Sequence, residues 1–564
     1  MTKFYFQPKL ETNPPDVETL RQYLTLPLFC EFENGKLFKE VQSQFSRGII
    51  GMPKNTWNVV EKWMIRQTPS YFRNLVQNYK TTALHIFKQR GQASNSDLEH
   101  YLGLILCFLR VLNRINVMEN KISYEDFYIP EIVDFFDLSQ HYFEWMKARA
   151  NRIETQGFFV CNFPFIFDAG AKTVLLQTDQ ALQMQTAAHQ ALTEAAFRSM
   201  LEQIRLNPEE VGFLICSVRR DHLVEDTLTF IQCVPDFSEF KKPLKVKFDG
   251  EEGDDAGGVR KEFFLLLLRE ILDPKYGMFK EYEETNAIWF NPSCFDEDNI
   301  MLFMIGVLCG LAIYNYTIIN LPFPLAIYKK MLNEDVGSIE DLEGLSPALA
   351  KGLRDLLAHE QDDVEDVFCL NFAVTEDVFG ETQTKELKPN GENIAVTKEN
   401  RDEYVKLYCD YVLNKSVERL YKAFHTGFVK VCGGRVLDLF HARELEALVV
   451  GTQKYDWTEF EEQTEYKNGY DKDSPAIKYF WEIFHELSEE DKKKFLLFLT
   501  GTDRIPLLGM TAKKMTIQKT GDPNYLPVAH TCFNLLDLPE YATKEKLKYK
   551  LLQAIHGTQG FGLV

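Results

Sequence analysis

Apolar residues recur at helical spacing through much of the first two hundred positions. Asp97 stands before a run of apolar residues that repeats every three or four positions as far as Leu112, which predicts a capped, amphipathic helix. Residues 133–148 show a similar pattern and are rich in aromatic side chains, so a second helix packed on a core is expected there. The N-terminal region, 1–204, is therefore predicted to be mainly helical.

Beyond residue 204 the pattern mixes two periods. Leu244, Val246 and Phe248 alternate with lysines, which predicts a strand with one buried face. The same reasoning predicts a fold of class α+β with helices in the majority. The remaining expectations are strands at 213–218, 368–372 and 515–517, an extended segment at 161–167 with a turn at 168–170, and helices at 221–230, 259–272 and 444–450.

The most apolar segment runs from residue 300 to residue 314 without a charged side chain. It is shorter than the ~20 residues that span a bilayer. Gly306 and Gly310 are spaced for close packing of helices, which occurs in water-soluble cores as well as in membranes. We predict a buried helix here and no membrane insertion.

Charge and composition narrow the classes of partner. The 63 basic and 83 acidic residues leave a formal charge of −20, which argues against nucleic acid as a main ligand. The glycine-rich acidic segment 250–258 lacks the Lys-Ser/Thr of a phosphate loop and the spacing of a calcium loop, so a turn into the following helix is predicted. No cofactor and no metal site are predicted.

Eleven cysteines are scattered along the chain, with no Cys-x-x-Cys pair and no zinc-type spacing. The first residues lack the apolar core of a signal peptide. An odd number of thiols without such a signal is typical of a reducing compartment, so a cytosolic protein is expected.

One of these cysteines, Cys532, lies near the C-terminus in the segment Leu-Pro-Val-Ala-His-Thr-Cys-Phe-Asn-Leu, residues 526–535. Apolar and turn-forming residues on both sides predict a short strand, or a loop at a strand edge, that ends in a turn. A thiol there suits either a nucleophile or core packing. If the segment is extended through Cys532, His530 lies on the same face, either to orient the loop or as a general base.

The words around Cys532 resemble the C-terminal lobe of HECT ubiquitin ligases. Further blocks follow in that family's order: Lys-Phe-Asp-Gly from 247, Glu-Leu-Lys-Pro-Asn-Gly from 386, Phe-Trp at 480 and Thr-Gly-Thr-x-Arg-x-Pro from 500. Residues 1–200 resemble more loosely the helical region before this domain in HERC-type ligases, and the propeller repeats of many such ligases are not visible. The resemblance implies a bilobal domain, with a large lobe at 205–449, a hinge at 450–452 and a small lobe at 453–564.

The same resemblance implies the chemistry and the partners. Cys532 is expected to take ubiquitin as a thioester from a conjugating enzyme and to pass it to a substrate lysine. His530, Thr531 and Asn534 are expected to support Cys532, and Phe561 to position the loaded lobe. A hydrophobic groove within 325–410, with Tyr404 as one contact, is expected to bind the conjugating enzyme.

The residues themselves are also compatible with two other functions. A cysteine hydrolase of ubiquitin-like conjugates would need a separate histidine base, for which His441 and His485 are the candidates. A noncatalytic scaffold would bind conjugating enzyme or ubiquitin without becoming charged.

Overall fold

The computed structural model describes residues 10, 12–14, 16–90, 96–151, 158–202, 207–251, 258–294, 299–378, 381–434, 436–510, 514–531 and 533–557. The chain forms two compact units, Met1–Asp179 and Gln180–Val564. The predicted class is confirmed, because helices dominate and the strands form small sheets. The long helix α9 (Ala169–Glu202) begins in the first unit and ends in the second.

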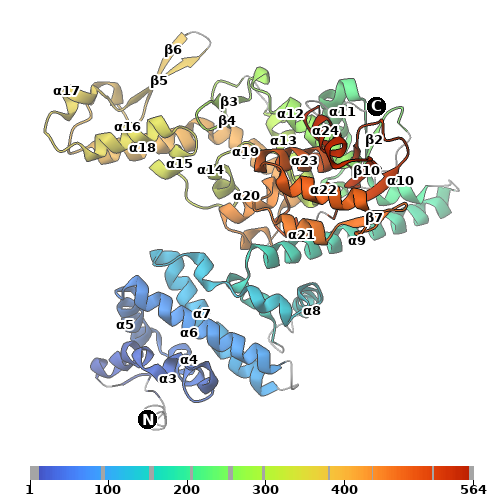
Figure 1. The fold of residues 1–564 in the computed structure, drawn as a ribbon. Helices are drawn as coiled ribbons and strands as arrows, with labels where there is room; N and C mark the ends of the chain where they lie inside the picture. Colours follow the sequence, from blue (N-terminus) through green and yellow to red (C-terminus); the bar gives the residue numbers. More distant parts are fainter. Residues whose placement is uncertain are drawn as a thin grey trace. The chain divides into compact units, whose positions relative to one another are not determined.

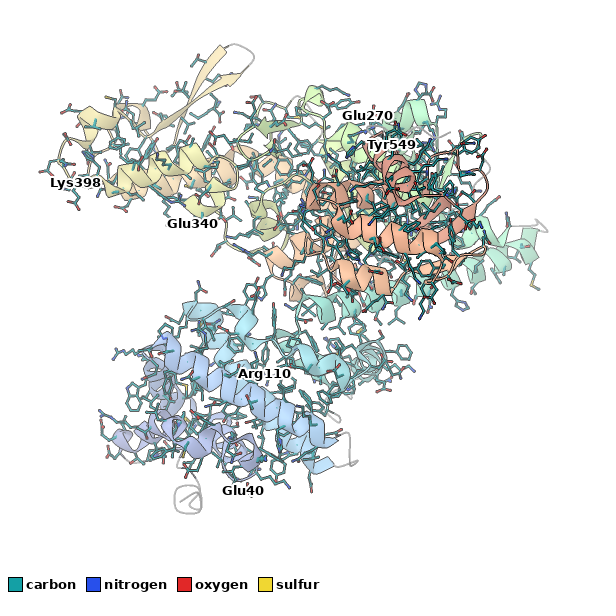
Figure 2. The ribbon with its side chains drawn as sticks, in the orientation of Figure 1. Glu40, Arg110, Glu270, Glu340, Lys398 and Tyr549 are labelled. Carbon is teal, nitrogen blue, oxygen red and sulfur yellow. The ribbon has the colours of Figure 1, made fainter. Side chains whose placement is uncertain are left out.

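The described residues of the first unit form helices joined by turns and loops, with no strand among them (Figure 1). Aromatic rings fill its core: Tyr79 and Phe108 lie 4.6 Å apart between ring centroids, and Phe45 packs edge-on against Phe108. Arg110, labelled in Figure 2, is exposed, and its guanidinium lies over the Phe163 ring. The helices are α2 (Gln22–Thr25), α3 (Cys30–Glu33), α4 (Gln42–Ile50), α5 (Lys54–Ile65), α6 (Pro69–Arg90), α7 (Ser96–Glu119) and α8 (Leu138–Ala150).

Local hydrogen bonds overturn three of the expectations for this unit. The helix predicted at 133–148 begins only at Leu138, because the Asp137 carboxylate caps it by accepting from two backbone N–H groups. The segment 161–167 is not extended but contains two short 3₁₀ turns. Asp168 does not open a turn; its side chain accepts from the Ala171 N–H at the start of α9.

Among the described residues, one helix is long and apolar enough to cross a membrane by length and composition. It lies within α7, from Asp97 to Glu119, and 44% of its apolar window is buried inside the structure. A buried core helix meets the same criterion, so the finding is weak evidence for a membrane.

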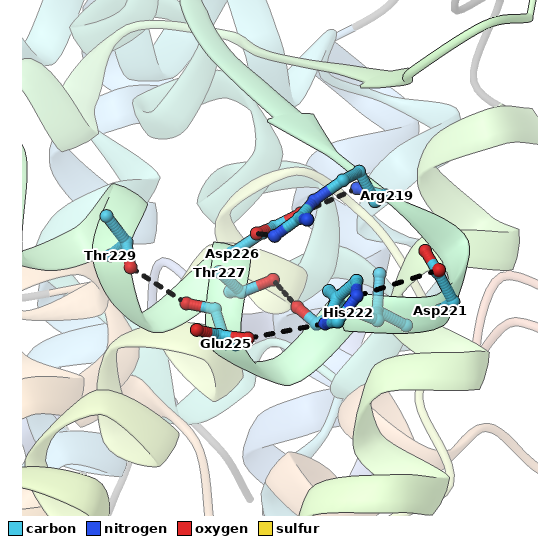
Figure 3. A network of polar contacts seen from close by, with 8 residues as sticks. Arg219, Asp221, His222, Glu225, Asp226, Thr227 and Thr229 are labelled. Carbon is cyan, nitrogen blue, oxygen red and sulfur yellow. Dashed lines mark hydrogen bonds and ion pairs between the residues drawn. The ribbon is translucent and has the colours of Figure 1, made fainter.

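After α9, the second unit continues with two parallel strands, β1 (Leu214–Val218) and β2 (Leu244–Phe248). The helices around them are α10 (Pro208–Gly212), α11 (Leu223–Cys233) and α12 (Gly258–Ile271). Figure 3 shows how the end of β1 is fastened to α11: the Arg219 guanidinium and its backbone N–H both donate to Asp226. The next residue, Arg220, pairs with Glu251 after β2 and with Glu262 on α12.

A pair of closely packed helices forms the centre of this unit. Helix α13 (Ile300–Tyr314) has the predicted bounds and is almost entirely buried. It packs against α19 (Glu418–Cys432), where a Cβ added to Gly306 would overlap the carbonyl oxygen of Phe424. The paired glycines therefore serve close contact between helices within the described structure.

The elements between these two helices, drawn mainly in yellow and pale green in Figure 1, include the 325–410 region. Lys398, labelled in Figure 2, pairs with Asp362 there at 2.7 Å. The predicted strand at 368–372 is wrong, because a helix ends at Phe368 and the strand starts at Ala373. The elements around and between α13 and α19 are β3 (Phe279–Tyr282), β4 (Ala287–Phe290), α14 (Leu325–Met331), α15 (Ile339–Glu343), α16 (Pro347–Ala358), α17 (Val364–Phe368), β5 (Ala373–Val378), β6 (Glu381–Glu386) and α18 (Arg401–Leu413).

The last part of the chain follows α20 (Ala442–Val450), which ends at Gly451 as predicted. Here a four-stranded sheet and its covering helices share one cluster of buried side chains, with Ile517, Leu536 and Phe495 fully buried. The elements are α21 (Trp457–Glu462), β7 (Glu465–Lys467), α22 (Pro475–Glu486), α23 (Glu489–Thr500), β8 (Thr516–Thr520), β9 (Val528–His530), β10 (Leu535–Pro539) and α24 (Lys544–His556).

Candidate active site

The four-stranded sheet positions the segment that holds Cys532. Its strand order is β7-β8-β10-β9, with β8 parallel to β7 and β10, and β9 antiparallel to β10. Residues 517, 536 and 538 face the core, so the alternation of side chains sends residues 516, 518, 535 and 537 to the opposite face. That second face is more polar than the face toward the core, and it continues into the turn between β9 and β10.

The turn itself is a tight hairpin connection. His530 pairs with Leu535 across β9 and β10, and the Phe533 N–H donates to the His530 carbonyl at 3.0 Å. Asn534 has a φ of 48°, a left-handed conformation that asparagine tolerates better than most residues. Its carbonyl oxygen accepts from the Thr516 N–H at 3.0 Å, so β8 holds the far side of the turn.

The structure describes some of the predicted site residues and not others. Cys532 and Phe561 lie outside the described residues. Thr531 is half-buried in the turn. The Asn534 amide nitrogen lies 3.5 Å from the Lys514 carbonyl, and its Oδ1 is buried without a hydrogen-bond partner among the described groups.

His530 has a specific partner that the sequence did not reveal. Its Nε2 lies 2.9 Å from Oδ2 of Asp537 on the neighbouring strand. Strand β9 ends at His530 and the turn begins there. Because Cys532 lies outside the described residues, the expectation that it shares a face with His530 stays a prediction. A carboxylate within the apolar run Leu-Leu-Asp-Leu-Pro is the one sequence signal that would have pointed to Asp537.

Apolar side chains surround this turn on the surface. Tyr525 is 70% exposed and Phe533 is 63% exposed, and Leu526 and Val528 are exposed as well. The loop before β9 is nevertheless held in place, because the Tyr541 hydroxyl donates to the Tyr525 carbonyl at 2.6 Å. The turn is thus presented on a fixed support with its aromatic neighbour Phe533 turned to solvent.

Most of the other thiols are unsuited to nucleophilic chemistry. Burial raises the pKa of Cys161, Cys216 and Cys309 to about 12, which removes the reactive thiolate at neutral pH. At the surface, a hydrogen bond from the Cys30 thiol to Glu31 raises its pKa too. These four cysteines therefore have structural or incidental roles.

The two histidines that a hydrolase would need already have structural partners. His441 caps α20 in a capping box with Glu444, so it serves the helix terminus. His485 Nε2 lies 2.6 Å from Glu461 on the outside of the C-terminal cluster. Neither contact brings a base to the turn at 531–534.

Tyr404, the expected contact for a conjugating enzyme, lies in a core. Its side chain is 3% exposed and packs edge-on against Phe372, with ring centroids 5.5 Å apart. In this conformation Tyr404 supports α18 from inside and offers little surface to a partner.

The four-stranded sheet and its turn lie within a segment that matches a known protein family. The family model for the HECT-domain (ubiquitin-transferase) matches residues 265–564, more than half of the chain. The chain belongs to the HECT-domain family.

Several curated proteins are similar to the chain over nearly all its length. It is 45% identical over 575 residues to the probable E3 ubiquitin-protein ligase HERC4 of Mus musculus, covering 99% of this chain and 54% of that protein. It is 45% identical to human HERC3, a probable E3 ubiquitin-protein ligase, over 99% of this chain and 53% of that protein. It is 38% identical to the probable E3 ubiquitin-protein ligase HECTD2 of Mus musculus, over 98% of this chain and 72% of that protein. The chain spans about half the length of the HERC relatives.

Proposed function

We propose that the chain is the catalytic part of a ubiquitin-protein ligase that carries ubiquitin as a thioester on Cys532. The observation that carries the proposal is the match of residues 265–564 to the ubiquitin-transferase family, with His-Thr-Cys-Phe-Asn at the β9–β10 turn. The similarity to HERC and HECTD ligases favours this function over a hydrolase or a scaffold.

The reaction has two acyl transfers. The Cys532 thiolate attacks the thioester carbonyl of a charged conjugating enzyme, and the enzyme's own thiolate leaves. A substrate lysine amine then attacks the Cys532 thioester, which forms an isopeptide bond and releases the Cys532 thiolate. Because one thioester replaces another in the first step, the free-energy change is small, and orientation of three proteins supplies much of the rate.

The proposal assigns roles along the chain. Residues 205–449 form the large lobe, 450–452 the hinge and 453–564 the catalytic lobe, with 1–204 as a helical region before them. The region 325–410 receives the conjugating enzyme. Thr531 and Asn534 hold the turn, and Phe561 orients the loaded lobe. Partners are a conjugating enzyme, ubiquitin and a protein substrate, in the cytosol, as the free thiols of the ten described cysteines favour.

A gel assay tests the proposal directly. The full chain is mixed with activating enzyme, conjugating enzyme, ubiquitin and ATP, and samples are run with and without reductant. Wild type is expected to form a reducible ubiquitin adduct, Cys532→Ala to form none, and Cys532→Ser to trap an oxyester that resists reductant. The matched control is Cys233→Ala, which removes another exposed thiol and leaves the adduct intact. A reducible adduct on Cys532→Ala would contradict the proposal.

A further inference from the structure

A line of hydrogen-bonded side chains runs from the residue after β7 across β8 and β10 and ends at His530 on β9. Asn468, after β7, donates to Gln518 on β8 at 3.0 Å. Gln518 donates in turn to Oδ1 of Asp537 on β10 at 2.6 Å. Oδ2 of Asp537 lies 2.9 Å from Nε2 of His530 on β9. We name these four residues the sheet relay.

The relay determines which ring nitrogen of His530 holds a proton. An ionised carboxylate only accepts hydrogen bonds, so the contact with Asp537 requires an N–H at Nε2 of His530. In the neutral ring Nδ1 then keeps its lone pair and is the only nitrogen able to accept a proton. Gln518 occupies the other carboxylate oxygen, which keeps Asp537 from rotating away.

Exposure differs between the two members of this pair. The His530 side chain is 45% exposed, whereas that of Asp537 is 19% exposed. The ring can therefore meet a group arriving from solvent, while the carboxylate behind it stays shielded and hydrogen-bonded. This is the arrangement of an oriented proton acceptor with its orienting group.

We propose that Asp537 is a positioning residue for the second acyl transfer, in which it orients His530 toward the attacking lysine amine. The inference rests on the proposed function. The neutral amine adds to the thioester carbonyl, and the nitrogen then loses one proton to Nδ1 of His530. The C–S bond breaks, its electron pair leaves with Cys532 as thiolate, and the imidazolium passes its proton to water. Asp537 stabilises the imidazolium and stays ionised.

The first transfer has much less need of such a base. There the thiolate of Cys532 replaces another thiolate, so no net proton leaves the reacting groups. A lysine amine, with an ordinary pKa of about 10.4, must by contrast shed protons before and during bond formation. A defect in the relay should therefore separate the two steps.

The variant Asp537→Asn tests this separation. An amide that still accepts from Gln518 turns its NH₂ toward His530, which demands the opposite tautomer and removes the free lone pair at Nδ1. In single-turnover assays on the full chain, the rate of loading from the conjugating enzyme should stay within about twofold of wild type. Discharge of the loaded chain to free lysine should fall about 10- to 100-fold at saturating lysine. This is less than the roughly 10²- to 10⁴-fold that general acid–base catalysis typically contributes, because His530 itself is still present.

The matched control is Glu540→Gln, the same carboxylate-to-amide change near the end of the same strand. Glu540 pairs with Lys519 at the surface and lies outside the relay. This variant should load and discharge at wild-type rates. A loss of discharge equal to that of Asp537→Asn would overturn the inference.

A double-mutant cycle distinguishes action through His530 from a general weakening of the sheet. In a His530→Ala background, Asp537→Asn should cause no further loss of discharge, because the group it orients is gone. An additive loss, or equal slowing of loading and discharge, would contradict a positioning role. His530→Ala also covers the case in which Asp537→Asn fails to fold, because the exposed His530 side chain can be removed without disturbing the core. If the His530→Ala variant discharges at the wild-type rate, the inference is overturned. If wild type itself forms no adduct on Cys532, the proposed function fails instead.

Discussion

Two aspartates in the second unit are each held by several donors, yet the donors differ in kind. Asp226 accepts from the Arg219 guanidinium and backbone N–H, a full positive charge that serves to join β1 to α11. Asp537 accepts from a neutral amide and an imidazole at the end of the sheet. The first arrangement stabilises a fold element, and the second leaves an oriented ring at the surface.

The contact of Asp226 predicts a specific loss of stability in acid. Arg219 lowers the pKa of Asp226 to about 2, below the 3.9 expected in the unfolded chain. A carboxyl group whose pKa is lower in the folded state stabilises the fold at pH values above its unfolded-state pKa. This stabilisation is lost as the pH falls through the folded-state pKa. Asp226→Asn should therefore destabilise the protein at pH 7, and the difference from wild type should shrink between about pH 4 and pH 2.

Urea unfolding at pH 7 and pH 3 measures this difference. Asp221→Asn serves as control, because Asp221 is a highly exposed neighbour whose carboxylate approaches His222 Nε2 only to 3.6 Å. A difference between Asp226→Asn and wild type that stays constant across the two pH values would refute the assignment.

At the residue scale, the sequence indicates which side chain could react better than it indicates which side chains are in contact. The words around Cys532 single out one thiol of eleven, and burial independently removes several of the others. Asp537 was missed because its contact with His530 depends on the register of β9 against β10. No spacing along the chain encodes that register, since it is set by the turn and by the buried faces of both strands.

At the element scale, long apolar patterns were predicted more accurately than short polar ones. Helix α13 has the bounds that its apolar run indicates, because a segment without charged side chains is stable only when buried. The segments at 133–148 and 161–167 were misjudged because aspartate caps and tight turns compete with the apolar pattern. Capping hydrogen bonds depend on one side chain, so a periodic pattern does not reveal them.

The contact between α13 and α19 predicts a large effect of one methyl group. A Cβ at position 306 would overlap the carbonyl oxygen of Phe424 and come within 2.9 Å of the Phe428 nitrogen, both backbone atoms. The two helices would have to separate, at a cost of about 1–3 kcal/mol or more. Gly306→Ala should lower the free energy of unfolding accordingly.

The control is Gly352→Ala in the interior of α16, where an added Cβ meets no atom within 4 Å. Alanine favours a helix over glycine by up to about 1 kcal/mol, so this variant should be neutral or more stable. Chemical denaturation of both variants decides the matter, and equal stability would show that α13 and α19 do not pack as described.

At the scale of the whole molecule, family membership adds what geometry alone does not supply. The turn, the sheet relay and the exposed apolar side chains around the turn would fit several reactions at a thiol. The match over residues 265–564 places the chain in the HECT-domain (ubiquitin-transferase) family. The acyl transfer proposed above would require the turn to meet a partner's thioester and then a lysine. The proposed transfer would make use of the proposed hinge, which lies between α20 and the four-stranded sheet.

Gly451, the C-cap residue of α20, begins the segment between α20 and the four-stranded sheet. It adopts φ 80° and ψ 179°, and its neighbour Thr452 exchanges two backbone hydrogen bonds with Ile505, which lies between α23 and β8. An added Cβ would lie 2.8 Å from the Ile505 carbonyl and 3.0 Å from Cβ of Arg504. The glycine therefore permits a backbone conformation and a close approach that other residues resist.

Gly451→Ala should accordingly strain the backbone by about 1–3 kcal/mol and loosen the bridge between Thr452 and Ile505. Because the catalytic part would then sit differently on α20, loading of Cys532 from the conjugating enzyme should slow, while the catalytic sheet itself stays folded. Gly434→Ala, at an open position before α20, is the matched control and should leave loading unchanged. Loading rates of the two variants, measured beside their unfolding curves, test the connection: equal rates would mean that the junction at Gly451 does not govern transfer.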